Sequence, residues 1–236
     1  TAGISGRLSF ISGTASGGAS GSIDVSTGAS THGRGGSMYI TVGKSKTNYG
    51  GDVTTFAGDS AVKTGGSISL ATGEGTKKST GSIFVSTVDA GTGGVSGHLS
   101  FSSGTTSSGT SGTLKFYTND ATAGKAGNVL FTVGNTQSNE VGGSAVLSAG
   151  DQTGNTGGAL SLFAGFGLHT SGAVRIVTPN AGTGGVSGDL TFFSGTTSNG
   201  ASGTFKMSTG ASTHGRGGSM YITIGKSKTN YGGDVT

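Results

Sequence analysis

A repeat of 15 residues runs along this chain and constrains its fold more than any other feature. Cut at a recurring glycine, the sequence reads TASGGASGSIDVSTG at 14–28, ASTHGRGGSMYITVG at 29–43, KSKTNYGGDVTTFAG at 44–58 and DSAVKTGGSISLATG at 59–73. Most later units keep this length, so the 236 residues hold about 16 units. A repeat of this kind is typical of arrays in which each unit is supported by its neighbours.

A longer period is superimposed on the short one. The segment TAGISG at 1–6 returns as TGGVSG at 92–97 and at 183–188, an offset of 91 residues each time. Residues 29–54 return as 211–236, where only Val42 and Ile224 differ. The pattern predicts one continuous array over 1–236, with repeat blocks at about 1–91, 92–182 and 183–236. Both ends lie inside the repeat pattern, so we expect a segment of a longer array.

Apolar and polar residues alternate within each unit. Ile23 and Val25 flank Asp24, and Leu99 and Phe101 flank Ser100. A period of two is typical of an extended strand with one apolar face. We call the apolar residues that this alternation turns inward the inner columns: Ile23, Val25, Met38, Ile40, Val42, Ile68, Leu70, Leu99, Phe101, Leu114, Phe116, Leu160, Leu162, Val174 and Ile176.

Energetics favour stacking of these units. Two or three inward side chains contribute roughly 3–6 kcal/mol by burial, whereas ordering about 15 residues costs at least 15 kcal/mol of backbone entropy. Stacking at about 4.8 Å would pair each strand with the next and join the inner columns. The sequence therefore predicts an all-β fold, a β-solenoid of about 16 coils of about 15 residues with a 91-residue higher-order repeat. A β-sandwich would not require so constant a spacing, and a calcium-binding β-roll is disfavoured because only 10 residues are acidic.

Composition excludes several other classes. Glycine occupies 52 positions and proline one, without the glycine at every third residue that collagen needs. Charged residues make up 10% of the chain, whereas disordered chains combine low hydrophobicity with high charge. The absence of cysteine excludes disulfides and cysteine-ligated zinc, and no apolar run is long enough to span a membrane. The net charge of +4 is dispersed, so we expect no nucleic-acid partner.

Candidate catalytic and metal-binding residues are few. The four histidines, His32, His98, His169 and His214, share no metal-ligand or catalytic spacing. Stacking would place the acidic residues that open three successive units, Asp59, Glu74 and Asp89, about 5 Å apart. They are candidates for a weak cation ladder, while turn formation is the alternative. We expect no catalytic residue and no cofactor.

The same alternation turns a second set of apolar residues outward. We call them the outer columns, and they recur along the array: Ile11, Tyr39, Phe56, Phe84, Tyr117, Leu130, Val146, Phe163, Val177, Phe193 and Tyr221. Recurrent exposed apolar residues indicate contact with a neighbouring subunit or domain. All of them except Val146 and Val177 are our candidates for a lateral interface. Threonines such as Thr27 and Thr118 also recur in one column, but the alternation turns that column inward, which disfavours an ice-binding face.

Two stretches carry a family resemblance. GVSGHLSFSSGTTSSGTSGTLKF at 94–116 and GGDVTTFAG at 50–58 resemble very large Gly/Ser/Thr-rich repeat proteins predicted from marine microalgae such as diatoms. The likeness extends over essentially the whole chain. It implies an extracellular, fibrous or surface role and supplies no catalytic residues. Similar repeat arrays also occur in bacterial adhesins.

The function expected from these patterns is structural and non-enzymatic. A long extracellular repeat protein would form, or build into, a filament or surface appendage, and would associate with itself through lateral or end-to-end contacts. The alternative is an adhesin stalk or ligand-binding solenoid that recognises glycan, mineral or ice surfaces. An enzyme is disfavoured because no acid/base constellation recurs among the units.

Overall fold

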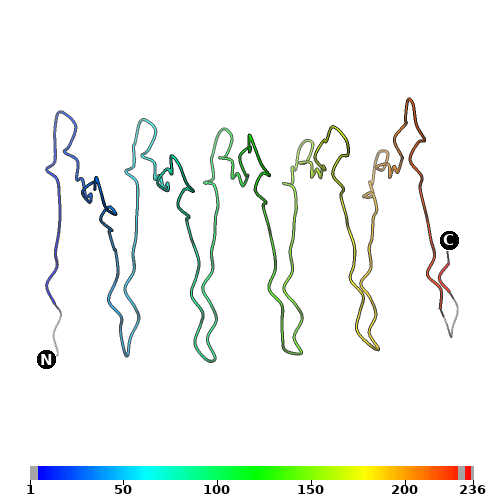
Figure 1. Ribbon diagram of the computed structural model, residues 1–236, viewed down its shortest axis with the longest axis horizontal. Coiled ribbons are helices and arrows are strands. Elements are labelled where there is room, and N and C mark those ends of the chain that lie inside the picture. The colour runs from blue at the N-terminus through cyan, green and yellow to red at the C-terminus, as the bar shows by residue number, and fades with distance from the viewer. Residues whose placement is uncertain (1–4, 228–231, 235–236) are drawn as a thin grey trace. The chain divides into compact units, whose positions relative to one another are not determined.

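The computed structural model describes residues 5–227 and 232–234, and none of these residues belongs to a helix or a strand. The predicted all-β fold, a β-solenoid of stacked 15-residue coils, is therefore wrong. The described chain is instead an irregular coil in which extended segments alternate with loops (Figure 1). We call the extended segments legs.

Bends punctuate the coil at the period of the sequence repeat. Neighbouring bends begin 15 or 16 residues apart throughout the described residues. Each lies in the Gly/Ser/Thr-rich part of a unit, where small residues favour turns. The bends lie at 16–18, 31–33, 46–48, 61–63, 76–78, 92–93, 107–109, 122–124, 138–140, 153–155, 168–169, 183–184, 198–200 and 213–215.

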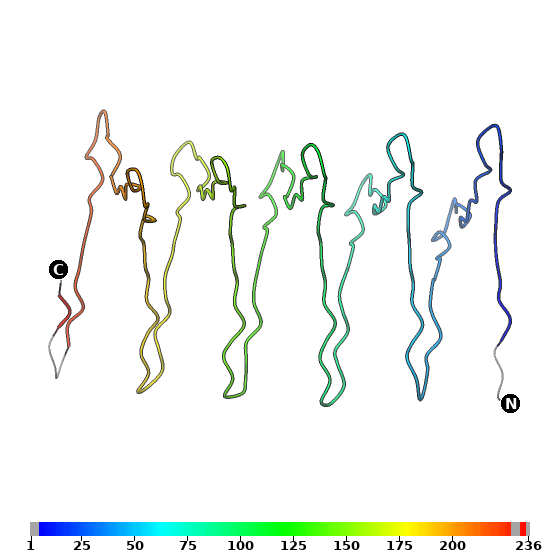
Figure 2. The same ribbon diagram turned by 180° about the vertical axis from the view of Figure 1, so that it is seen from behind.

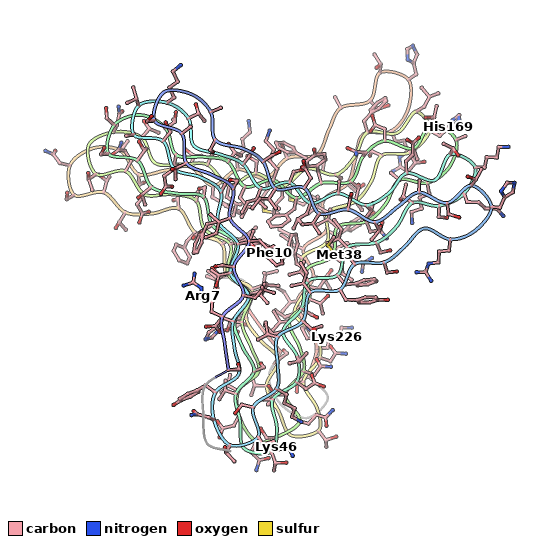
Figure 3. All side chains as sticks on the ribbon, turned by 90° about the vertical axis from the view of Figure 1, so that its left-hand side faces the viewer. Arg7, Phe10, Met38, Lys46, His169 and Lys226 are labelled. Atoms are coloured by element: carbon pink, nitrogen blue, oxygen red, sulfur yellow. The ribbon has the colours of Figure 1, made fainter. Side chains whose placement is uncertain are left out.

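The chain divides into two compact units, Thr1–Phe116 and Tyr117–Thr236. In the first unit, the bends at 46–48 and 92–93 lie at the same lower edge of Figures 1 and 2, and the bends between them do not. Figure 3 places Lys46 at the tip of one loop, whereas Phe10 and Met38 lie nearer the middle of the view. Successive 15-residue units therefore point in different directions, and an equivalent loop returns only after three units.

This path explains why the alternation does not produce strands. A period of two reports which way side chains face, but strand pairing also needs a neighbouring backbone about 4.8 Å away. Every backbone–backbone hydrogen bond among the described residues joins two glycines of one loop. Gly66 N donates to Gly58 O at 2.8 Å, and Gly158 N donates to Gly150 O at 2.9 Å. These bonds close loops and leave the legs without a ladder.

No described residue is buried, but exposure still follows the predicted alternation. Inner-column side chains are 47% to 79% exposed, whereas outer-column side chains are 71% to 90% exposed. The prediction of facing is thus visible in the legs, while the continuous core that it implied is absent from the described chain. Only six described residues are half-buried, and all are small: Ser12, Ser45, Ala57, Gly75, Ala149 and Gly167.

Candidate functional site

The base of most loops is a close contact between one residue and a glycine eight to ten positions later. The earlier residue is small in most of these loops and is Val42, Val133 or Ile224 in three of them. Thr27 Oγ1 donates to the carbonyl oxygen of Gly36 at 3.1 Å, and a Cβ added at Gly36 would lie 3.1 Å from Thr27 Cβ. The equivalent pair 91 residues on repeats the bond, from Thr118 Oγ1 to Gly127 O at 3.2 Å. Thr27 and Thr118, which share one column of the repeat, therefore help to close their loops through a side-chain hydrogen bond. Sequence reasoning missed this role, although the fixed spacing from threonine to glycine was a visible signal.

A second loop type is built on a tight turn. Gly94 N donates to Gly91 O at 3.0 Å, and Gly93 between them has φ of +80°. A positive φ at the third residue is the signature of a type II turn, which favours glycine there. The copy 91 residues on repeats it, with Gly185 N bonded to Gly182 O at 3.1 Å and φ of +80° at Gly184. This geometry accounts for the repeated GTGG segment.

Serine hydroxyls order several loop tips. Ser30 Oγ accepts a hydrogen bond from Gly33 N at 2.9 Å, and Ser212 Oγ accepts one from Gly215 N at the same distance.

Three of the four histidines lie in bends: His32, His169 (Figure 3) and His214. All four are exposed, and His98 lies in a leg. Their placement matches turn positions more closely than a ligand set.

The three acidic candidates are not brought together. Asp59, Glu74 and Asp89 belong to three successive loops, next to the bends at 61–63, 76–78 and 92–93. No group of three His, Cys, Asp or Glu residues that could hold a metal ion occurs within residues 5–227 and 232–234. The expected cation ladder needed these carboxylates to be about 5 Å apart in stacked coils. The described chain contains no stacked coils, so that spacing has no structural basis.

Aromatic side chains join legs on either side of a loop. The rings of Phe101 and Phe116 meet edge to face, with centroids 6.3 Å apart and planes at 82°. In the second unit, Phe192 and Phe205 are also 6.3 Å apart, with planes at 30°. Aromatic pairs at this separation attract one another. They couple neighbouring legs while each ring stays more than half exposed.

The outer columns present large apolar side chains to solvent along both compact units. The nine lateral-interface candidates are all exposed, from 71% for Tyr117 to 90% for Phe84. They are Ile11, Tyr39, Phe56, Phe84, Tyr117, Leu130, Phe163, Phe193 and Tyr221. Large apolar side chains exposed in such number are unusual for a chain that works alone in water.

No cavity is found in the part of the chain that the structure describes, and none of that part is a helix long and apolar enough to cross a membrane. No protein-family model, curated protein or solved structure matches this chain. The outer columns and the repeated loops are therefore the features of the described chain that bear on its function.

Proposed function

We propose that this chain is a non-enzymatic structural protein of an extracellular filament or surface appendage, and that its copies associate through the outer columns. The observation that carries the proposal is the exposed area of the single chain, which is 24333 Å². A compact protein of 22.6 kDa would expose about 9,500 Å². The excess, about 15,000 Å², is many times the roughly 1,600 Å² that a standard protein–protein interface buries.

The chemistry of that surface favours a second copy of the chain as the partner. Burial of apolar area is favourable at about 25 cal/mol per Å². Association therefore releases the most free energy when the outer columns are buried against another apolar array. A second copy carries the same columns at the same spacing. Charged residues make up only 10% of the sequence and the net charge is +4, so electrostatic repulsion between copies is weak.

The non-enzymatic and extracellular parts of the proposal have separate support. The repeat blocks preserve glycines, loop-base residues and inner columns, but no set of acidic, basic and nucleophilic residues recurs with them. Repetition of architecture without repetition of chemistry is typical of structural arrays. The extracellular location is supported by the resemblance to large Gly/Ser/Thr-rich surface proteins of microalgae.

The test is the state of the full chain in solution. We expect the weight-average mass in sedimentation equilibrium to rise with protein concentration, and electron microscopy to reveal elongated assemblies. Salt should change the association little, because the contacts are apolar. A chain that stays monomeric at every accessible concentration would overturn the proposal. Saturable binding of that monomer on a glycan array would then favour the adhesin alternative.

A further inference from the structure

Some outer-column positions keep a large side chain from one 91-residue block to the next, and others do not. This difference indicates which outer-column residues contribute most to self-association. Most outer-column residues are replaced by small or charged residues one block away: Phe84 by Arg175, and Phe56 by Ser148, where the 16-residue unit at 135–150 shifts the alignment to 92 residues. Among the outer columns, one position is large in all three blocks, where it is Tyr39, Leu130 and Tyr221. These three residues recur at 39, 130 and 221, which is every 91 residues. We call them the recurrent set.

The surroundings of the recurrent set are also repeated. Each member follows a bend, at 31–33, 122–124 or 213–215, and stands between two inner-column positions of the next leg. Their exposed fractions are nearly the same, at 84%, 83% and 87%. Equal spacing along the chain and equal local setting give three equivalent apolar contacts, two of them tyrosines, a residue type enriched at the energetic centres of interfaces.

From this recurrence we infer that Tyr39, Leu130 and Tyr221 are the anchors through which a second copy of this chain binds, and that the remaining outer-column residues contribute little. The inference rests on the proposed self-association and assigns it to specific residues. A partner that meets all three anchors must itself present apolar sites at the same 91-residue spacing, which another copy does.

The test compares two triple variants of the full chain. Tyr39→Ser, Leu130→Ser and Tyr221→Ser together remove the recurrent set. The control, Phe56→Ser, Phe84→Ser and Phe163→Ser, removes three outward side chains of at least similar size that do not recur. We expect the first variant to associate about 100-fold more weakly than the unmodified chain, and the control to stay within about threefold of it.

The outcomes separate this inference from the proposed function. If the unmodified chain does not associate, both fail. If it associates and the control variant is weakened as much as the recurrent-set variant, the proposed function stands and the assignment of anchors is wrong. A loss confined to the recurrent-set variant supports the assignment, provided that the amide spectra of the loops are unchanged.

A separate observation concerns the loop at 195–203. It contains the one Asn–Gly step of the chain, Asn199–Gly200, at an exposed bend. Gly200 has φ of +143°, and a Cβ at this glycine would come no closer than 3.8 Å to its nearest neighbour, Thr197 Oγ1. We propose that Asn199 is a site of spontaneous deamidation. The backbone nitrogen of Gly200 attacks Cγ of Asn199, a C–N bond forms, and ammonia leaves with the amide proton.

Water then opens the resulting succinimide at either carbonyl and gives aspartate or isoaspartate, so the loop gains a negative charge. Glycine at the following position favours this step because it does not shield the nitrogen and leaves the backbone free to adopt the reacting geometry. The equivalent loop one block earlier is a matched control, because it carries Ser108–Gly109 with φ of +116° at Gly109.

Prolonged incubation of the full chain at neutral pH, followed by peptide mass spectrometry, tests the proposal. We expect Asn199 to convert before any other asparagine, and the Asn199→Ser variant to show no new charge at this loop. Conversion of Asn48 or Asn155 at the same rate, or an intact Asn199 after the other asparagines have reacted, would overturn it.

Discussion

Loops and legs of this chain are ordered by different interactions. A loop such as 27–36 is closed by a contact between its own first and last residues, Thr27 and Gly36. A leg such as 98–103 has regular apolar alternation, yet its backbone makes no hydrogen bond to another leg within the described residues. The loops therefore carry their order in local sequence, whereas the legs present an apolar pattern that a second copy would complete. Changes at the recurrent set in the legs should alter association, and changes in loop glycines should alter local geometry alone.

The largest expected effect comes from a charge placed in a leg. Leu130→Asp puts a carboxylate into an anchor contact, where burial without a partner costs about 3 kcal/mol. We expect the association constant measured by sedimentation to fall about 100-fold. Ser198→Asp places the same charge in a loop tip and is the control, with an expected change of less than about threefold. Equal loss in both variants would break the distinction between legs and loops.

The second prediction changes a loop and expects the legs, and therefore association, to be unaffected. A Cβ at Gly167 would overlap the backbone carbonyl oxygen of Thr170, whereas one at Gly165 would meet nothing within 4 Å. Gly167→Ala should therefore destabilise closure of this loop by about 2 kcal/mol, and Gly165→Ala should not. The measurement is the amide shift of Gly172, whose N–H donates to Gly165 O at 2.9 Å. Association should be unaffected, and a parallel loss of association would contradict local order.

Local features were predictable from the sequence to the extent that they depend on neighbouring residues. The repeat of 15 residues reappears in the spacing of the bends, and the inner-column Leu99 is 53% exposed whereas the outer-column Phe84 is 90% exposed. The β-solenoid was not predictable in this way, because pairing depends on where the chain turns after each unit. The loop at 27–36 redirects the chain, so the next unit does not stack on the previous one (Figure 1).

The candidate sites also differ in whether they depend on neighbouring residues or on the stacking of distant units. Asp59, Glu74 and Asp89 were grouped only on the assumption of stacked coils, and they lie in three separate loops. The outer columns needed only the direction of alternate side chains, and each of their residues is exposed. Whether those residues bind another copy stays a prediction, because it concerns a second molecule.

A smaller effect is expected at the type II turn. Gly93 has φ of +80°, a conformation that costs an alanine roughly 1–2 kcal/mol, while Gly91 in the same turn has no positive φ. Gly93→Ala should weaken the bond from Gly94 N to Gly91 O, which spans 3.0 Å. Faster exchange of the Gly94 amide would report this, and Gly91→Ala should leave the rate within about twofold. The same exchange rate in both variants would show that the turn is not formed in solution.

The smallest effect tests whether loops are independent of their surroundings. Ser30→Ala removes the acceptor of the Gly33 amide, and Ser212→Ala removes the acceptor of the Gly215 amide, in loops of identical sequence that belong to different compact units. Loss of one such hydrogen bond costs about 1 kcal/mol. If local sequence alone orders the loops, the exchange rates of the two amides should rise by the same factor, about fivefold. Unequal factors would show that a loop responds to the unit around it, and the separation of loops from legs would then need revision.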